Sequence, residues 1–296
     1  MSQSVVPTNR ELYQPIERLS DRKTMSQLVK STRWLADIRE TKPLRVWGID
    51  LGTTNSTIAE ISWHPENDVG TLPECRCLEL EQSTDAGVYT SPLVASVVAI
   101  LPSGEHWVGE GAKRLRTRPQ DAGLVVERTL FFETKNDMGL RKTYYRAPET
   151  YNHAHKIAGH ILQFIETAAE QVSGARPDRT VVTVPASFQL NQRRDTLKAA
   201  KLAGLELSDH DLLDEPTAAL LDYLFTHPRE DLITPGQISK GVIFDFGGGT
   251  CDVSVVEIEP SPYDVNFRIS PLAVSRYHRL GGGGCRCGPS ARVWAR

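Results

Sequence analysis

Residues 46–61 read Val-Trp-Gly-Ile-Asp-Leu-Gly-Thr-Thr-Asn-Ser-Thr-Ile-Ala-Glu-Ile. An apolar, β-favouring run ends at Asp50, and Gly52 and several hydroxyl residues separate it from a second β-favouring run. This pattern predicts two strands joined by a polar turn. Gly52 permits backbone conformations that other residues resist, so the following amides can point at one anion. An acid beside such a turn suits a divalent cation between carboxylate and phosphate. On these residues alone, an ordinary hairpin turn remains the alternative.

The composition is typical of a soluble globular protein large enough for two domains. The chain has 296 residues, of which 40% are hydrophobic and 24% are charged. Its formal net charge of -3 gives no sign of a nucleic-acid-binding protein. Five cysteines in a long chain do not form a disulfide framework, which favours a reducing cytoplasm. Neither an export signal nor a membrane anchor is expected.

A second segment repeats the first. Residues 241–258 read Gly-Val-Ile-Phe-Asp-Phe-Gly-Gly-Gly-Thr-Cys-Asp-Val-Ser-Val-Val-Glu-Ile, so that Asp245 matches Asp50 and Gly247 matches Gly52. Two copies of one turn predict two similar lobes that face one ligand. The repeat therefore favours nucleotide binding.

The segments between the two copies alternate between helix and strand patterns. Apolar residues at spacings of three and four over 151–172 predict a long helix that ends at Gly174. Residues 180–184 predict a buried strand that ends before Pro185. Asn191 is expected to cap the next helix, which ends at Gly204.

Several local features can be interpreted in two ways. Residues 88–101 and 107–109 predict a hairpin in a small lobe. A basic cluster of four residues follows it: Lys113, Arg114, Arg116 and Arg118. Three of these four charges are expected on a solvated helix face. Glu215, before Pro216, is either a helix-capping charge or a site residue. Cys75 and Cys77 lack the clustered partners of a metal site.

Five ordered segments resemble the ATPase domain of the Hsp70 (DnaK-type) chaperones, within the actin, sugar kinase and Hsp70 superfamily. The resemblance covers residues 44–283 and lies in the motifs at 49–56, 184–188, 192–193, 215–219 and 244–254. It implies an α/β, actin-like ATPase (ribonuclease H-like) fold, with the first lobe complete and the second only begun.

The resemblance also implies a role for individual residues. The phosphates of ATP or ADP would be bound by eight residues of the two turns: Gly52, Thr53, Thr54, Asn55, Gly247, Gly248, Gly249 and Thr250. Asp50 and Asp245 would hold Mg²⁺ through water. The catalytic residues would be Lys113, Glu215, Asp245 and Asp252. Pro185 and Arg193 resemble the family's switch. Asp214 departs from the family's usual Asn.

The implied organisation has four parts. Residues 1–43 form a helical or disordered extension, 44–238 the first lobe with a small insertion at about 82–147, 239–283 the start of the second lobe, and 284–296 an atypical tail. The tail shows no periodicity. We hypothesise that it results from out-of-frame translation or truncation, which the downstream nucleotide sequence would test.

The expected function is an ATP-binding and ATP-hydrolysing module of a cytoplasmic chaperone active in protein folding and the stress response, with hydrolysis impaired by truncation. Client proteins and co-chaperones would be partners of a full-length relative; nucleic acid and membranes would not. A non-catalytic partner-binding fragment is the alternative, and an actin-like sugar or metabolite kinase is a weaker one.

Overall fold

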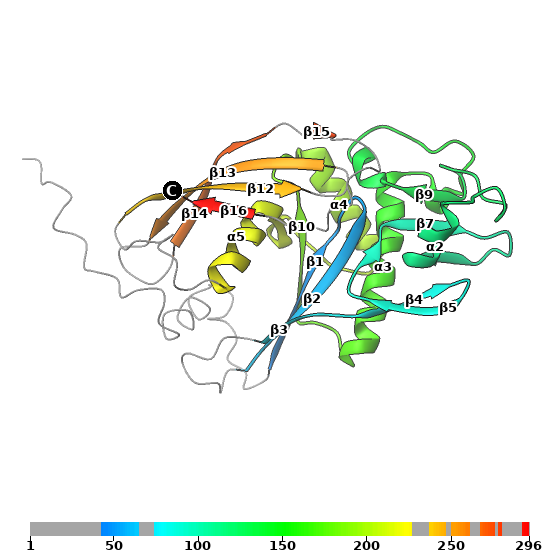
Figure 1. The fold of residues 1–296 in the computed structure, drawn as a ribbon, viewed down its shortest axis with the longest axis horizontal. Helices are drawn as coiled ribbons and strands as arrows, with labels where there is room; N and C mark the ends of the chain where they lie inside the picture. Colours follow the sequence, from blue (N-terminus) through cyan, green and yellow to red (C-terminus); the bar gives the residue numbers. More distant parts are fainter. Residues whose placement is uncertain are drawn as a thin grey trace, which may run out of the picture.

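A five-strand path forms the centre of the first lobe (Figure 1). The computed structural model describes residues 43–64, 74–226, 237–246, 250–260, 267–275, 278–279 and 292–295. The sheet order is β11-β10-β1-β2-β3, and the strands are β1 Leu44–Asp50, β2 Asn55–Trp63, β3 Glu74–Cys77, β10 Arg179–Val184 and β11 Leu212–Asp214. β6, Val94–Ala95, pairs with β2. β1 and β2 are antiparallel, which confirms the predicted strand–turn–strand unit.

Side chains of β1 alternate between core and solvent. Trp47 and Ile49 are fully buried, whereas Gly48 and Asp50 are exposed. This period of two is the ordinary consequence of strand geometry. Asp50 therefore ends the strand on the side away from the core.

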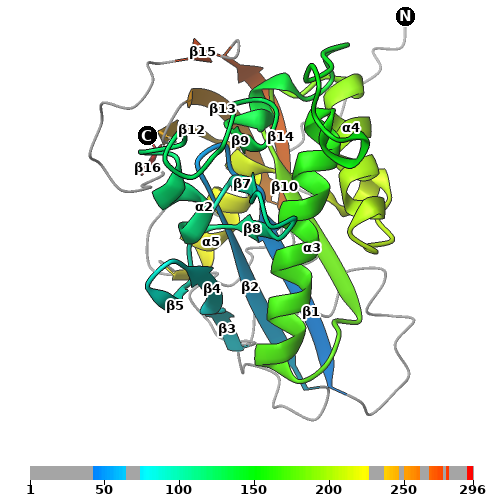
Figure 2. The same ribbon diagram turned by 90° about the vertical axis from the view of Figure 1, so that its right-hand side faces the viewer.

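Two long helices cover one face of this sheet. α3, Ala154–Ser173, contacts β2, and α4, Leu190–Leu202, packs against α3 (Figure 2). Gly174 ends α3 in the left-handed region at φ 71°, as its sequence pattern predicts. The predicted cap of α4 is wrong. Gln189 caps this helix in a reciprocal capping box with Gln192, while Asn191 lies within the first turn.

The small insertion contains a two-stranded and a three-stranded sheet. Its strands are β4 Leu80–Thr84, β5 Gly87–Ser91, β7 Val97–Ile100, β8 His106–Val108 and β9 Leu130–Phe132. β7 and β8 form the predicted hairpin. The helical segments between and after them are α2 Glu110–Leu115, and the 3₁₀ turns η1 Thr134–Asp137 and η2 Glu149–Tyr151. A further 3₁₀ turn, η3 Asp209–Asp211, precedes β11.

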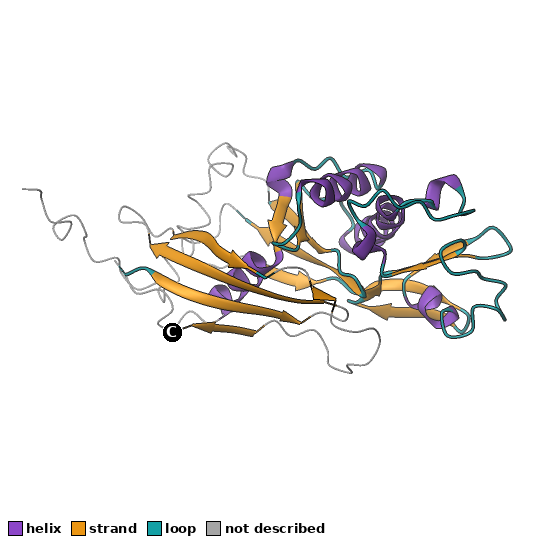
Figure 3. Cartoon of the chain, turned by 90° about the horizontal axis from the view of Figure 1, so that it is seen from above, coloured by secondary structure: helices purple, strands orange, loops and turns teal. Residues whose placement is uncertain are grey.

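A second sheet has the order β14-β13-β12-β16. Its strands are β12 Ser239–Phe246, β13 Thr250–Pro260, β14 Phe267–Val274 and β16 Arg292–Ala295, and β15 His278–Arg279 pairs with β13. α5, Glu215–Thr226, contacts β10 and β11 of the first sheet and β12 of the second (Figure 3). Leu220 of α5 packs with Ile243 and Val256, so this helix joins the two lobes through an apolar contact.

The ends of the chain are described only in part. Residues 1–42 and 284–291 lie outside the described residues, so most of the predicted extension and tail does too. Arg292–Ala295 pair with β12, which places regular structure where the sequence showed no periodicity. Cys75 and Cys77 are exposed free thiols. Within the parts that the structure describes, no helix has the length and apolar character needed to cross a membrane.

Candidate functional site

The turn between β1 and β2 is tightly closed. A Cβ added to Gly52 would lie 2.0 Å from the carbonyl oxygen of Asn55, so a side chain there would force the turn open. Ser96 holds the turn, because its hydroxyl donates to the Gly52 carbonyl at 2.8 Å and its amide donates to the Thr54 carbonyl at 2.9 Å. A compact turn of this kind presents successive amides to one point.

Asp50 stands beside this turn and is held by the neighbouring strand. β10 lies parallel to β1 with Thr183 opposite Asp50, and the Thr183 hydroxyl donates to Asp50 Oδ1 at 2.9 Å. Thr183 was not predicted as a site residue. Its position one residue before the end of a strand parallel to β1 is the signal that could have identified it.

The second hairpin presents a pair of acids. Asp245 and Asp252 lie opposite each other in the β12–β13 ladder, and Asp252 is 8% exposed. Thr250 begins β13, while Gly247, Gly248 and Gly249 lie outside the described residues. Their predicted phosphate contacts remain predictions.

Glu215, the first residue of α5, meets acids from both hairpins. Burial raises its pKa to about 7, Lys135 counteracts the rise, and Asp50 and Asp245 add to it. The pKa of Asp245 is also raised, first by burial and then by Asp50, although Lys135 and a hydrogen bond with Glu215 oppose the shift. The carboxyl group of Glu215 thus shares its surroundings with acids from both hairpins, and its catalytic role remains a prediction.

Lys135 provides a positive charge beside the carboxyl group of Glu215. Its Nζ lies 2.7 Å from Glu215 Oε1, and the two side chains are only 10% and 16% exposed. The ammonium group also lies 5.7 Å from the centre of the Phe188 ring. The sequence interpretation missed Lys135, since it stands in the 3₁₀ turn η1, 80 residues before its partner, and no motif marks it.

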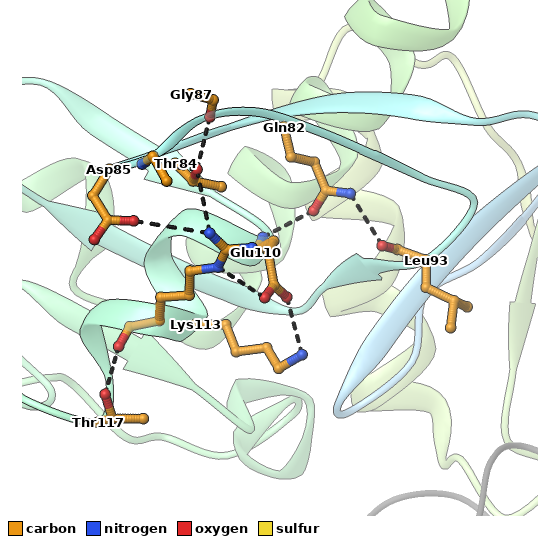
Figure 4. A network of polar contacts seen from close by, with 10 residues as sticks. Gln82, Thr84, Asp85, Gly87, Leu93, Glu110, Lys113 and Thr117 are labelled. Carbon is orange, nitrogen blue, oxygen red and sulfur yellow. Dashed lines mark hydrogen bonds and ion pairs between the residues drawn. The ribbon is translucent and has the colours of Figure 1, made fainter.

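Lys113, the predicted catalytic lysine, is placed elsewhere. Its Nζ pairs with Glu110 Oε2 at 3.0 Å, one turn earlier on α2, and its side chain is 54% exposed (Figure 4). Glu110 also pairs with Arg114 at 3.1 Å. The structure does not bring Lys113 to Glu215, because a local partner of opposite charge satisfies it on the helix surface. The four members of the basic cluster are all exposed.

The two predicted switch residues flank the site. Arg193, on α4, donates to Asp214 Oδ1, so the Asp that departs from the family's usual Asn forms an ion pair immediately before Glu215. Pro185 is buried at the end of β10, and its carbonyl accepts from the Phe188 amide at 2.9 Å. Their relay role remains a prediction.

The residues present fit a hydrated Mg²⁺ ion. Carboxylate oxygens are the ligand type that this ion prefers, usually together with water and phosphate. Burial is the main cause of the raised pKa values of Glu215 and Asp245, and repulsion from the Asp50 carboxylate raises both further, while Lys135 opposes the shifts. A divalent cation beside Asp50 and Asp245 would relieve that repulsion.

Comparisons with known proteins point to one protein family. The family model described as "Hsp70 protein" matches residues 46–267. A chaperone protein DnaK of Mycoplasmopsis pulmonis (strain UAB CTIP) is 35% identical over 238 residues, which are 80% of this chain and 33% of that relative. A chaperone protein DnaK of Nitrosopumilus maritimus (strain SCM1) is 34% identical over 221 residues, which are 75% of this chain and 30% of the relative. The chain thus spans about a third of the length of these curated relatives.

Proposed function

Because this chain belongs to the Hsp70 family, we propose that the site between its two hairpins binds ATP or ADP with Mg²⁺ and hydrolyses ATP. Family membership implies the actin-like ATPase fold expected from the sequence, and the mixed α/β architecture agrees with it. One observation supports the proposal above the others. Lys135 Nζ lies 2.7 Å from Glu215 Oε1, and the pKa of Glu215 is raised by burial and then by Asp50 and Asp245, which come from the two hairpins.

The proposed binding mode assigns a task to each part of the site. The amides and hydroxyls of Gly52, Thr53, Thr54 and Asn55, and those of residues 247–250, would bind the β- and γ-phosphates. Asp50 and Asp245 would hold Mg²⁺ through water, and the ion would supply positive charge to the phosphates. Glu215, Asp245 and Asp252 would orient the attacking water. Phosphoryl transfer depends mainly on such positioning and charge compensation.

The wider function is proposed from the same family relationship. We infer that a longer relative of this chain would couple nucleotide state to client proteins and co-chaperones in the cytoplasm, through Pro185 and Arg193. The ion pair between Arg193 and Asp214 supports this role, because it joins α4 to the residue before Glu215.

Isothermal titration calorimetry with Mg-ATP tests the proposed function. Wild-type chain is expected to bind, and Asp50→Ala is expected to abolish binding, since it removes the acid beside the phosphate turn. Asp85→Ala is the matched control, because Asp85 is 62% exposed in the insertion and pairs only loosely with Arg114, at 3.9 Å.

The outcomes separate the competing functions. Absence of Mg-ATP binding by the wild-type chain would contradict the proposal and favour the partner-binding fragment. Binding with hydrolysis to phosphate supports the ATPase. Transfer of the phosphoryl group to a sugar, with none to water, would favour the kinase alternative.

A further inference from the structure

Two thiols lie on one face of β3, the last strand of the first sheet. In the ladder with β2, Cys75 lies opposite Ile61 and Cys77 lies opposite Ala59. Side chains two residues apart on a strand point to the same face, so the two thiols are neighbours. Both cysteines are exposed and free. We propose that Cys75 and Cys77 bind one soft, two-coordinate metal ion, Cu(I), between their sulfur atoms.

The register of β3 shows which face carries the thiols. Arg76, between the two cysteines, lies opposite Glu60, and its Nη2 donates to Glu60 Oε1 at 2.9 Å. Glu60 is only 2% exposed, so Arg76 turns toward the buried side of β2. The thiols therefore point to the other face of the sheet, where the charge of Asp222 on α5 acts on Cys75.

The spacing of the thiols favours a bridging ion over a disulfide. Alternate residues of a strand are roughly 6.8 Å apart, and their side chains stand about parallel to each other. A disulfide needs Cβ atoms about 3.5–4.5 Å apart, so the strand would have to deform. Two metal–thiolate bonds of about 2.3 Å each span about 4.6 Å between sulfurs. Two cysteine side chains that lean toward each other reach this separation without movement of the backbone.

The number of available ligands selects the class of ion. Structural Zn²⁺ takes four ligands, and among the described residues no third His, Cys, Asp or Glu joins the two thiols in a metal-binding group. Thiolates are soft ligands that suit Cu(I), an ion that is stable with two ligands in a line. Asp222 acts on Cys75 through its charge rather than as a ligand.

Binding exchanges two protons for one ion. Partial desolvation raises the pKa of the Cys75 thiol most, and Cys77 and Asp222 raise that pKa further. Each sulfur forms a bond to Cu(I) as its S–H bond breaks, and both protons pass to solvent. The copper is neither oxidised nor reduced, and the product carries one negative charge. Affinity for Cu(I) should therefore increase with pH.

Anaerobic titration of the full chain with Cu(I), against a Cu(I)-selective chromogenic chelator, tests the site. Cys285 and Cys287 form a second Cys-x-Cys sequence outside the described residues, so the reference chain carries Cys285→Ser and Cys287→Ser. It should bind Cu(I) in equimolar amount. Adding Cys75→Ser should raise the Kd by about a hundredfold or more, since even an outer partner of a metal site contributes about 10- to 100-fold.

The matched control keeps two neighbouring thiols but separates their faces. Glu74 is exposed and directly precedes Cys75, so Glu74→Cys combined with Cys77→Ser places the second thiol on the opposite face of β3. This variant should bind Cu(I) as weakly as Cys75→Ser. Reference affinity in either variant would overturn the proposal.

Asp222→Asn tests the charge beside the site. Removing a like charge stabilises the anionic product, so the Kd for Cu(I) at pH 7 should fall by about threefold or more. An increase in Kd would show instead that Asp222 is a ligand and that the two-thiolate assignment is wrong.

Alkylation of the wild-type chain covers the case in which a variant does not fold. Cu(I) in twofold excess should protect Cys75 and Cys77 together from iodoacetamide, as measured by peptide mass spectrometry. Reaction of either thiol at its metal-free rate would contradict the inference. Neither experiment involves nucleotide, so a chain that binds Cu(I) here but not Mg-ATP would refute the proposed function alone.

Discussion

Gly52 determines whether the first turn can close. A methyl group on its Cα would lie 2.0 Å from the Asn55 carbonyl oxygen, a distance at which the backbone must move. Gly52→Ala should therefore open the turn and weaken Mg-ATP binding by about tenfold or more, equivalent to about 1.4 kcal/mol. Calorimetry measures this loss directly.

Gly48 provides the control within the same hairpin. A Cβ at Gly48 would meet no heavy atom within 4 Å, so Gly48→Ala should keep wild-type affinity. If both substitutions weaken binding equally, the loss does not come from the closed turn, and the assignment of these amides to phosphate would be wrong.

Asp211 gives a stability prediction that depends on pH. Burial alone would raise its pKa, but hydrogen bonds from Ser208 and the ion pair with Arg179 lower the pKa below the ordinary value of 3.8. Arg179 Nη2 and Nε donate to Asp211 Oδ1 at 2.8 and 3.0 Å. The folded state therefore binds the proton less well than the unfolded state does.

The sign of the effect follows from this difference. The ionised carboxylate stabilises the fold above the unfolded pKa, and its contribution declines as pH falls from about 5 through 3.8 toward the lowered folded pKa. Asp211→Asn should lower the free energy of unfolding by about 1.5–3 kcal/mol at pH 7. Urea unfolding should show this gap narrowing at acid pH. Asp209→Asn, at an exposed position of the same turn, should show no such gap, and a gap for Asp211→Asn that is constant with pH would contradict the assignment.

At the scale of elements, features that depend on local sequence patterns were predicted better than contacts between distant residues. The apolar spacing over 151–172 and Gly174 predicted α3, because helix periodicity and a left-handed end are both local properties. The cap of α4 was misassigned because Asn is a preferred cap residue and Gln is not, and the capping box of Gln189 with Gln192 decides the position of the cap. Lys135 was missed because its place beside Glu215 depends on tertiary packing, which one sequence does not display.

The connection between η1 and α4 can be tested through Gly139. Alanine at this left-handed position, φ +75°, costs about 1–2 kcal/mol in backbone strain. It also forces a Cβ within 2.8 Å of Asn191 Nδ2, which adds steric cost. Gly139→Ala should therefore lower the urea midpoint and weaken Mg-ATP binding, since η1 carries Lys135.

Gly174→Ala separates strain from contact. Gly174 also has a left-handed backbone, φ +71°, but a Cβ there would meet nothing within 4 Å. Gly174→Ala should therefore lose stability only through backbone strain, and it should retain wild-type affinity for Mg-ATP. Equal losses of stability and affinity in the two variants would show that the contacts of Gly139 with α4 do not position the site.

At the scale of the whole molecule, the site draws its acids from both lobes. Asp50 ends a strand of the first sheet, Asp245 lies on the second, and α5 connects the two sheets while presenting Glu215 between them. Burial raises the pKa values of Glu215 and Asp245 most, and repulsion from the Asp50 carboxylate raises both further. A ligand that carries Mg²⁺ would turn this repulsion into attraction, and nucleotide binding should then stabilise the chain as a unit.

Thermal unfolding measures that coupling. At a concentration of Mg-ATP about 100 times the Kd, binding adds about 2.7 kcal/mol, which corresponds to a rise of about 5 °C or more in Tm. EDTA should remove most of the rise at the same ATP concentration. Asp245→Ala should give an unliganded Tm equal to or above wild type, because one repelling charge is gone, but no rise with Mg-ATP. Asp85→Ala should keep the full rise, and a normal Mg-ATP shift in Asp245→Ala would show that the second hairpin does not take part in binding.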